Sequence, residues 1–162
     1  MKVWVINMEN LSKKVGDYCI KNNIKLTTAE SCTAGLISAT IAMTPGSSAW
    51  LDRGFVVYSA QAKNEMLGVS LDTIERFNIT SEQVAKDMAI GALSNSTANV
   101  SLAVTGIAGP SGGTDEIPVG TICMAWARGK NDVKTETLIF NGNRNEIRES
   151  VVTYMLNNLI CG

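Results

Sequence analysis

The sequence predicts an α/β fold: a three-layer α/β/α sandwich with a mostly parallel sheet plus an antiparallel hairpin. The chain has 162 residues, a length typical of one domain, and 45% of them are hydrophobic, which is enough to fill one core. Helical and strand patterns alternate along the chain, and no internal repeat or linker-like tract interrupts them. We therefore expect a single domain over residues 1–162.

The first half of the chain begins with an amphipathic helix. Apolar residues from Met8 to Cys19 recur at three- and four-residue steps, and this helix should end near Asn22. The elements expected after it are a strand over 24–28, a buried helix over 31–43 stopped by Pro45, a strand over 55–58 and a helix over 59–67 ending at Gly68.

The second half continues the alternation. Thr80 and Gln83 form a capping-box pattern, which predicts a helix whose apolar face begins at Val84. The remaining expected elements are a central strand over 100–105, two antiparallel strands over 119–127 and 134–140, and a last helix opened by Asn143 and Glu146. Ligands in open α/β sheets bind beyond the carboxyl ends of strands, so the loops after the first three strands should converge on a site.

Composition excludes several classes of function. With 14 basic and 15 acidic residues the net charge is -1, which gives no electrostatic footprint for nucleic acid as a primary partner. The chain contains no histidine, and this removes the usual general base and every Ser-His-Asp arrangement. The four cysteines are scattered without a C-x-x-C pair, so we expect reduced thiols in the cytoplasm and no zinc site.

Two long uncharged segments do not read as membrane spans. Residues 31–51 are broken by Pro45-Gly46, and residues 88–114 are rich in Ser, Thr, Asn and Gly, whereas a spanning helix needs about 20 predominantly apolar residues. The opening residues 1–10 lack the apolar core and cleavage site of a secretory signal. We expect no contact with a membrane.

Three residues are candidates for catalysis without histidine. Ser31 lies at a strand-to-helix turn, where it could be a nucleophile or only the helix N-cap. Lys63 could serve as its base if it is desolvated, or it could be a solvated surface lysine. Tyr58, at the end of a strand, could relay a proton or orient the lysine, or it could be a core aromatic with a wet hydroxyl.

Other groups could bind an anion. Glycines at 106, 109, 112 and 113 would let backbone N–H groups approach a phosphate, although the pattern is neither a Walker loop nor G-x-G-x-x-G, and a merely flexible connection is equally consistent with it. The pairs Asp52–Arg53 and Arg144–Arg148 could be surface ion pairs or an anion clamp. Spacing does not separate these alternatives.

Motifs spread over nearly the whole chain resemble the CinA carboxy-terminal domain family. The segments that carry the resemblance are Thr28-Ala-Glu-Ser-Cys-Thr-Ala-Gly35, Pro45-Gly-Ser-Ser48, Arg53-Gly-Phe-Val-Val-Tyr-Ser59, Lys63-x-x-x-Leu67-Gly-Val69, Thr105 to Thr114, Pro118-Val-Gly-Thr121, and Asn141 to Arg144 with Arg148. Two departures concern substrate affinity: Ala34-Gly35 replaces a common Gly-Gly pair, and Ile117 stands where many relatives have lysine.

The resemblance implies a nicotinamide mononucleotide deamidase, an amidohydrolase of pyridine nucleotide salvage that forms nicotinic acid mononucleotide and ammonia. It also implies a homodimer. The amino-terminal domain of longer relatives is missing from this sequence, so we expect the pyrophosphatase activity of that domain to be absent. We further expect a cytoplasmic protein that needs no metal or cofactor. Carried over residue by residue, the catalytic group is Ser31, Tyr58 and Lys63. The substrate-binding group is Glu30, Thr33, Gly35, Thr105, Gly106, Gly112, Gly113 and Arg144.

Two other readings remain open at this point. The chain could be a non-catalytic nucleotide-binding or interaction module that keeps the fold without turnover. It could also be an amidase for another small carboxamide. The joint presence of Ser31, Tyr58 and Lys63 favours an enzyme.

Overall fold

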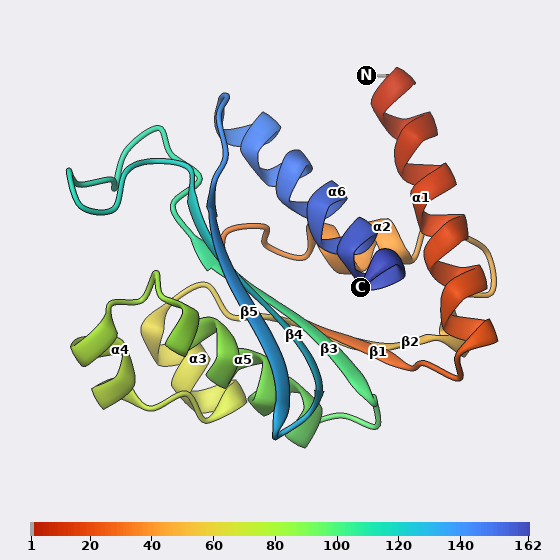
Figure 1. Cartoon of the computed structure of the whole chain (residues 1–162), viewed down its shortest axis with the longest axis horizontal. Helices are drawn as coiled ribbons and strands as arrows, with labels where there is room; N and C mark the ends of the chain where they lie inside the picture. Colours follow the sequence, from red (N-terminus) through yellow and green to blue (C-terminus); the bar gives the residue numbers. More distant parts are fainter. Residues whose placement is uncertain (1) are drawn as a thin grey trace.

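A five-stranded sheet forms the middle layer of the molecule (Figure 1). The computed structural model describes residues 2–162, with side chains from residue 7 onward, so the opening residues judged above not to form a secretory signal lie partly outside this range. The strands, in the spatial order β2-β1-β3-β4-β5, are β2 (Leu51–Val56), β1 (Leu26–Glu30), β3 (Val100–Gly106), β4 (Thr121–Gly129) and β5 (Asp132–Ile139).

Helices cover both faces of this sheet, which confirms the three-layer sandwich (Figure 1). One layer consists of α1 (Lys2–Lys21), α2 (Leu36–Ile41) and α6 (Arg144–Cys161). The other consists of α3 (Ala60–Leu67), α4 (Leu71–Phe77) and α5 (Glu82–Ser94). A short 3₁₀ helix, η1 (Ser47–Ala49), leads into β2.

The directions of the strands determine where the candidate site lies. β1 pairs in parallel with β2 and β3, whereas β4 runs antiparallel to both β3 and β5, so β4 alone runs against the other strands. This confirms a mostly parallel sheet with an antiparallel hairpin. The carboxyl ends of β1, β2 and β3 therefore lie at one edge of the sheet, where residues 30–31, 56–58 and 105–106 meet.

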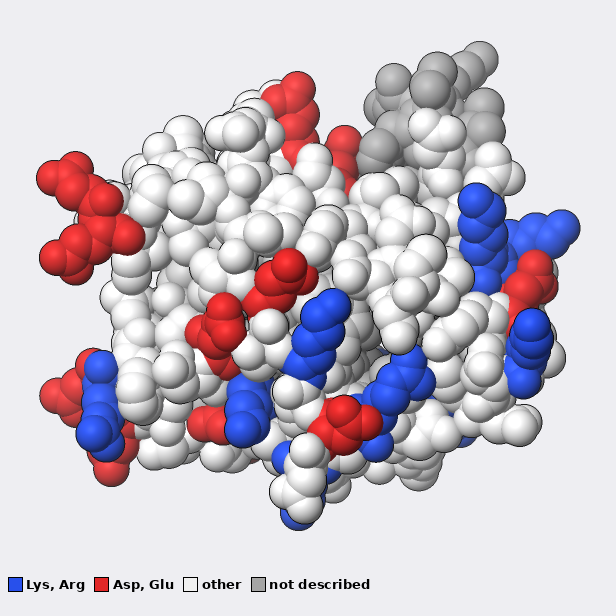
Figure 2. Space-filling view, viewed as in Figure 1, with Lys and Arg blue, Asp and Glu red and all other residues white. Residues whose placement is uncertain are grey.

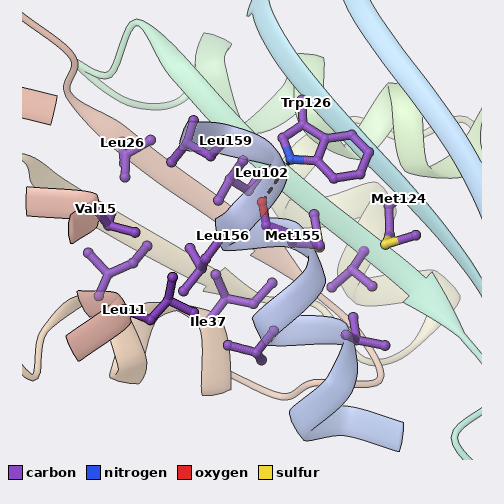
Figure 3. Close-up of a cluster of buried hydrophobic side chains, with 14 of the residues drawn as sticks. Leu11, Val15, Leu26, Ile37, Leu102, Met124, Trp126, Met155, Leu156 and Leu159 are labelled. Atoms are coloured by element: carbon purple, nitrogen blue, oxygen red, sulfur yellow. Dashed lines mark hydrogen bonds between the residues drawn. The ribbon is translucent and has the colours of Figure 1, made fainter. Parts of the chain in front are cut away.

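The two faces of the sheet carry side chains of different size. On β4, Met124 and Trp126 point into the core under α1 and α6 (Figure 3), and Ile122 belongs to the same cluster. The Trp126 Nε1–H donates to the Met155 carbonyl at 3.1 Å. The alternating residues are small and pack under α5: Cys123, Ala125 and Ala127. Because α5 meets a layer of small side chains, its backbone can lie close to the sheet.

Several boundaries differ from those expected. The helix expected from residue 31 begins at Leu36, because residues 31–35 form a turn in which Ala34 and Gly35 have φ of 51° and 92°. The cap of α5 is Ser81 rather than Thr80, since the Ser81 hydroxyl accepts from the Val84 N–H at 3.2 Å.

Other boundaries also shift, and one is confirmed. β2 starts at Leu51, earlier than expected, and α4 was not expected; it has only seven residues and buries none of them fully, so its apolar pattern is short. The capping box expected at Asn143 and Glu146 is confirmed.

Charge is dispersed on the visible surface. Figure 2 shows basic and acidic side chains interspersed among larger uncharged areas on the face in view. None of the described helices is long and apolar enough to cross a membrane. The four cysteines are free thiols, and Cys19, Cys32 and Cys123 are buried.

The contact between α3 and α5 predicts an unusual response to alanine. A Cβ atom at Gly91 would lie 2.1 Å from the Leu67 carbonyl oxygen. Glycine to alanine in a helix is ordinarily stabilising by about 1 kcal/mol, but here we expect Gly91→Ala to lower the free energy of unfolding by about 1–3 kcal/mol. Urea unfolding would measure it, with the exposed Lys86→Ala as control; a stabilised Gly91→Ala variant would contradict this packing.

Candidate active site

An open cavity of about 220 Å³ lies at the carboxyl edge of the parallel strands. Ser31 reaches it from the end of β1, Tyr58 from the end of β2, and Thr105 and Gly106 from the end of β3. The other lining residues are Cys32, Ile79, Thr80, Ile107, Ala108, Gly109, Ser111 and Arg144. The convergence expected from the sequence is therefore present.

Lys63 and Ser31 are in direct contact beside this cavity. The Lys63 side chain is fully buried, and its Nζ lies 2.9 Å from the Ser31 Oγ. Lys63 belongs to α3, and the N-cap of this helix is Ser59, whose hydroxyl accepts from the Ala62 N–H at 3.0 Å. The solvated-lysine alternative is thereby excluded, and so is a mere N-cap role for Ser31, because α2 begins only at Leu36.

The surroundings of the Lys63 amine lower its pKa. Its remaining partners are the carbonyl oxygens of Val57 at 2.8 Å and Tyr58 at 3.3 Å, and no carboxylate lies within salt-bridge distance among the described residues. Burial lowers the pKa of Lys63 to about 8. A neutral amine has two N–H groups and one lone pair, so donating to both carbonyls leaves the lone pair for the Ser31 hydroxyl.

The Ser31 hydroxyl has a second acceptor within reach. Its Oγ lies 3.4 Å from the Tyr58 carbonyl oxygen, to which it can donate while the Lys63 amine is protonated. Loss of the lysine proton lets the hydroxyl donate to Nζ instead. The pair can therefore activate Ser31 as a nucleophile without histidine.

Cys32 lines the same cavity but is chemically unsuited to attack. Burial raises the pKa of its thiol to about 12, so the thiol stays protonated near neutral pH. Because the thiolate is the nucleophilic form of cysteine, Ser31 is the better candidate.

Tyr58 and Arg144 frame the opening of the cavity. The Tyr58 side chain is 54% exposed, and its Oη accepts from the Arg144 Nη2 at 2.8 Å. The Arg144 Nη1 donates to the Gly109 carbonyl at 2.7 Å, and no carboxylate neutralises this guanidinium among the described residues. Arg53, in contrast, contacts Asp52 at 2.7 Å, so that pair is a surface ion pair.

Two backbone donors next to Ser31 are unengaged. The Ser31 N–H donates to the Val104 carbonyl at 3.0 Å, but those of Cys32 and Thr33 donate to no other residue in the part of the chain that the structure describes. Free N–H groups beside a nucleophile are suited to stabilise an oxyanion.

The expected substrate-binding residues divide into two groups. Thr105, Gly106 and Arg144 line the cavity, whereas Gly112 and Gly113 are exposed and outside its lining. The remaining three, Glu30, Thr33 and Gly35, also lie outside the lining.

Glu30 and Thr33 contact each other within the fold. Both side chains are fully buried, and the Thr33 Oγ1 donates to the Glu30 carboxylate at 2.7 Å. The polar side-chain atoms of both residues are therefore occupied within the fold, and Thr33 can reach a substrate only through its backbone N–H.

Part of the cavity wall was not found from the sequence. Ile79 and Thr80 come from the connection between α4 and α5, and the Thr105 hydroxyl donates to the Ile79 carbonyl at 2.9 Å. Only the folded chain brings this connection beside the end of β3.

Among residues 7–162, no group of three His, Cys, Asp or Glu side chains is placed to hold a metal ion.

Comparison with known proteins identifies relatives of this chain. The chain is 42% identical over 149 residues to the nicotinamide-nucleotide amidohydrolase PncC of Escherichia coli strain K12, covering 92% of this chain and 90% of that one. It is 44% identical to the PncC of Enterobacter agglomerans, covering 92% and 91%. A CinA-like protein of Akkermansia muciniphila is 44% identical, but the match spans only 34% of its length.

Solved structures agree with the fold. The crystal structure of the competence/damage inducible protein CihA from Agrobacterium tumefaciens superposes with a TM-score of 0.91 and 41% identity, covering 95% of this chain and 94% of that one. The sequence profile described as CinA C-terminal domain matches residues 8–161. With nearly its whole length matched, this chain belongs to the CinA C-terminal domain family.

Proposed function

We propose that this chain hydrolyses the carboxamide of nicotinamide mononucleotide, giving nicotinic acid mononucleotide and ammonia. The observation that carries the proposal is the buried Lys63 amine, 2.9 Å from the Ser31 hydroxyl at the wall of an open cavity. The choice of substrate is supported by two relatives named nicotinamide-nucleotide amidohydrolase, at 42% and 44% identity over most of both chains.

The first chemical step is acylation of Ser31. The Ser31 Oγ attacks the carboxamide carbon, its proton passes to Lys63 Nζ, and the carbonyl electron pair moves onto oxygen. The free N–H groups of Cys32 and Thr33 stabilise the resulting oxyanion.

Collapse of this tetrahedral intermediate releases ammonia. The C–N bond breaks as the leaving nitrogen takes the proton held by Lys63, so nitrogen departs as neutral ammonia and the amine becomes neutral again. The Tyr58 carbonyl oxygen keeps that amine oriented, at 3.3 Å. The Tyr58 hydroxyl already accepts from Arg144, which leaves its own proton free to donate to the substrate.

Hydrolysis of the acyl-enzyme completes the cycle. Lys63 takes a proton from water, the hydroxide oxygen bonds to the acyl carbon, and the C–O bond to Ser31 breaks. The proton on Lys63 returns to the Ser31 Oγ, which restores the resting pair and releases the carboxylic acid, whose remaining proton passes to the released ammonia or to bulk water.

The nucleotide phosphate is assigned to Arg144. Its guanidinium lies at the mouth of the cavity, without a carboxylate partner among the described residues. A guanidinium can bind a phosphate through two parallel hydrogen bonds, and it would exchange its contact with the Gly109 carbonyl for them.

The direct test is product formation from nicotinamide mononucleotide. We expect the purified chain to release ammonia and nicotinic acid mononucleotide in the presence of a chelator, and Ser31→Ala to lower kcat by at least about a thousandfold. Circular dichroism would establish that the variant is folded. An inactive wild-type chain that still gains thermal stability from the nucleotide would point to a binding module, and turnover of other carboxamides only would point to another amidase.

The low pKa of Lys63 predicts the pH dependence of the reaction. The amine must be neutral to accept the serine proton, so kcat/KM should rise with pH and level off above about 8. At pH 7 about one molecule in ten would carry the neutral amine. A pH profile between 6 and 9.5 would measure it, and an activity that is flat or falls over that range would remove Lys63 as the base.

Arg144 should control affinity for the phosphorylated substrate. We expect Arg144→Gln to raise KM for nicotinamide mononucleotide by about 10- to 100-fold, because a charge-assisted contact to phosphate is lost. Nicotinamide riboside, which has no phosphate, should show little change. Arg53→Gln, remote from the cavity, is the matched control; an equal loss for both substrates would contradict phosphate binding by Arg144.

The homodimer, the cytoplasmic location and the role in pyridine nucleotide salvage remain predictions from the family resemblance. Light scattering on the purified chain, cell fractionation and growth of a deletion strain on nicotinamide mononucleotide would test them.

A further inference from the structure

A carboxylate is buried beneath the turn that carries Ser31. Glu30 is the last residue of β1, and its side chain is fully buried. No cation lies within salt-bridge distance of it among the described residues. Five donor atoms lie within hydrogen-bond distance of it: near Oε1 are Thr28 Oγ1 at 3.1 Å, Ser38 N at 2.9 Å and Ser38 Oγ at 3.0 Å, and near Oε2 are Thr33 Oγ1 at 2.7 Å and Ile37 N at 3.0 Å. The Thr28 and Ser38 hydroxyls also share a hydrogen bond, so one of them donates to the other while the other donates to Glu30.

The Glu30 carboxylate takes no direct part in the proposed reaction. Burying a carboxylate is unfavourable unless hydrogen bonds replace its lost hydration, and here dedicated donors do so. They come from three separate parts of the chain, namely β1, the turn over residues 31–35 and the start of α2. Glu30 therefore fixes the position of the turn relative to both the sheet and the helix.

The turn over residues 31–35 has features that call for such support. Ala34 adopts φ of 51°, a conformation that a residue with a Cβ rarely takes. From the other side, Arg148 of α6 donates through Nη2 to the Thr33 carbonyl at 2.9 Å. Thr33 is thus held through its hydroxyl by Glu30 and through its carbonyl by Arg148, while its N–H stays free.

We propose that Glu30 is a positioning residue: by holding Thr33, it fixes the Ser31 hydroxyl and the adjoining backbone N–H groups relative to Lys63. The kinetic test of this inference rests on the proposed function. It predicts that the Glu30–Thr33 contact affects turnover more than substrate binding, because the cavity walls at Tyr58, Ile107 and Arg144 come from other segments.

A matched pair of variants tests this. Thr33→Val and Thr28→Val each remove one buried hydroxyl that contacts Glu30, but only Thr33 belongs to the turn. Each should lower the melting temperature by about 2–4 °C. Thr33→Val should also lower kcat by about 10- to 100-fold, with KM within about threefold, whereas Thr28→Val should keep kcat within about threefold. Thr33→Ser, which retains the hydroxyl, should recover turnover.

Equal kcat values for Thr33→Val and Thr28→Val would overturn the proposal. A second measurement separates it from the proposed function: labelling of Ser31 by an activated aryl ester, followed by mass spectrometry, reports the reactivity of the hydroxyl without any deamidation. Slower labelling in Thr33→Val than in Thr28→Val supports the positioning role even if nicotinamide mononucleotide is not a substrate. Unchanged labelling in both would refute that role.

Discussion

The site depends on an amine that the fold removes from water without giving it a counter-charge. Lys63 is surrounded by Val57 O, Tyr58 O and the Ser31 hydroxyl, and each of these is a neutral oxygen. These oxygens accept hydrogen bonds from the amine but bring no full negative charge, so the loss of hydration on burial is the main cause of the lowered pKa. A carboxylate partner would reverse the effect and hold the proton on nitrogen. The absence of histidine from the chain is compatible with base catalysis for this reason.

Glu30, whose charge is opposite to that of Lys63, is also held among neutral groups, but it serves another purpose. Its carboxylate is also buried without an ion-pair partner among the described residues, and its donors are hydroxyl and backbone N–H groups. Gly54 of β2 makes room for this group, because a Cβ there would lie 2.2 Å from the Ser38 Oγ. Fixed dipoles on both sides of Ser31 need little rearrangement during the reaction, which is the usual basis of electrostatic catalysis in proteins.

Sequence reasoning could find most elements and select Ser31 and Lys63 as candidates, but it could not find the exact turn or the walls of the cavity. Periodicity located the long helices and the hairpin, and the lack of histidine directed attention to Ser31 and Lys63. The sequence could not reveal that residues 31–35 lie outside the helix, because alanine gives no local signal for the positive φ that Ala34 adopts. The assignment of Glu30 to the substrate-binding group came from the family resemblance, and the sequence could not show that its side chain is fully buried.

The lining of the cavity has a further consequence for how this fold can change. The proposed reacting groups all lie between residues 31 and 63, whereas most of the remaining wall comes from residues 79–80, 105–111 and 144. Segments that are separate in the chain can diverge independently. Substitutions in these later segments could therefore allow other amides into the cavity while Ser31 and Lys63 stay unchanged. One ancestral reaction could in this way extend to many amides.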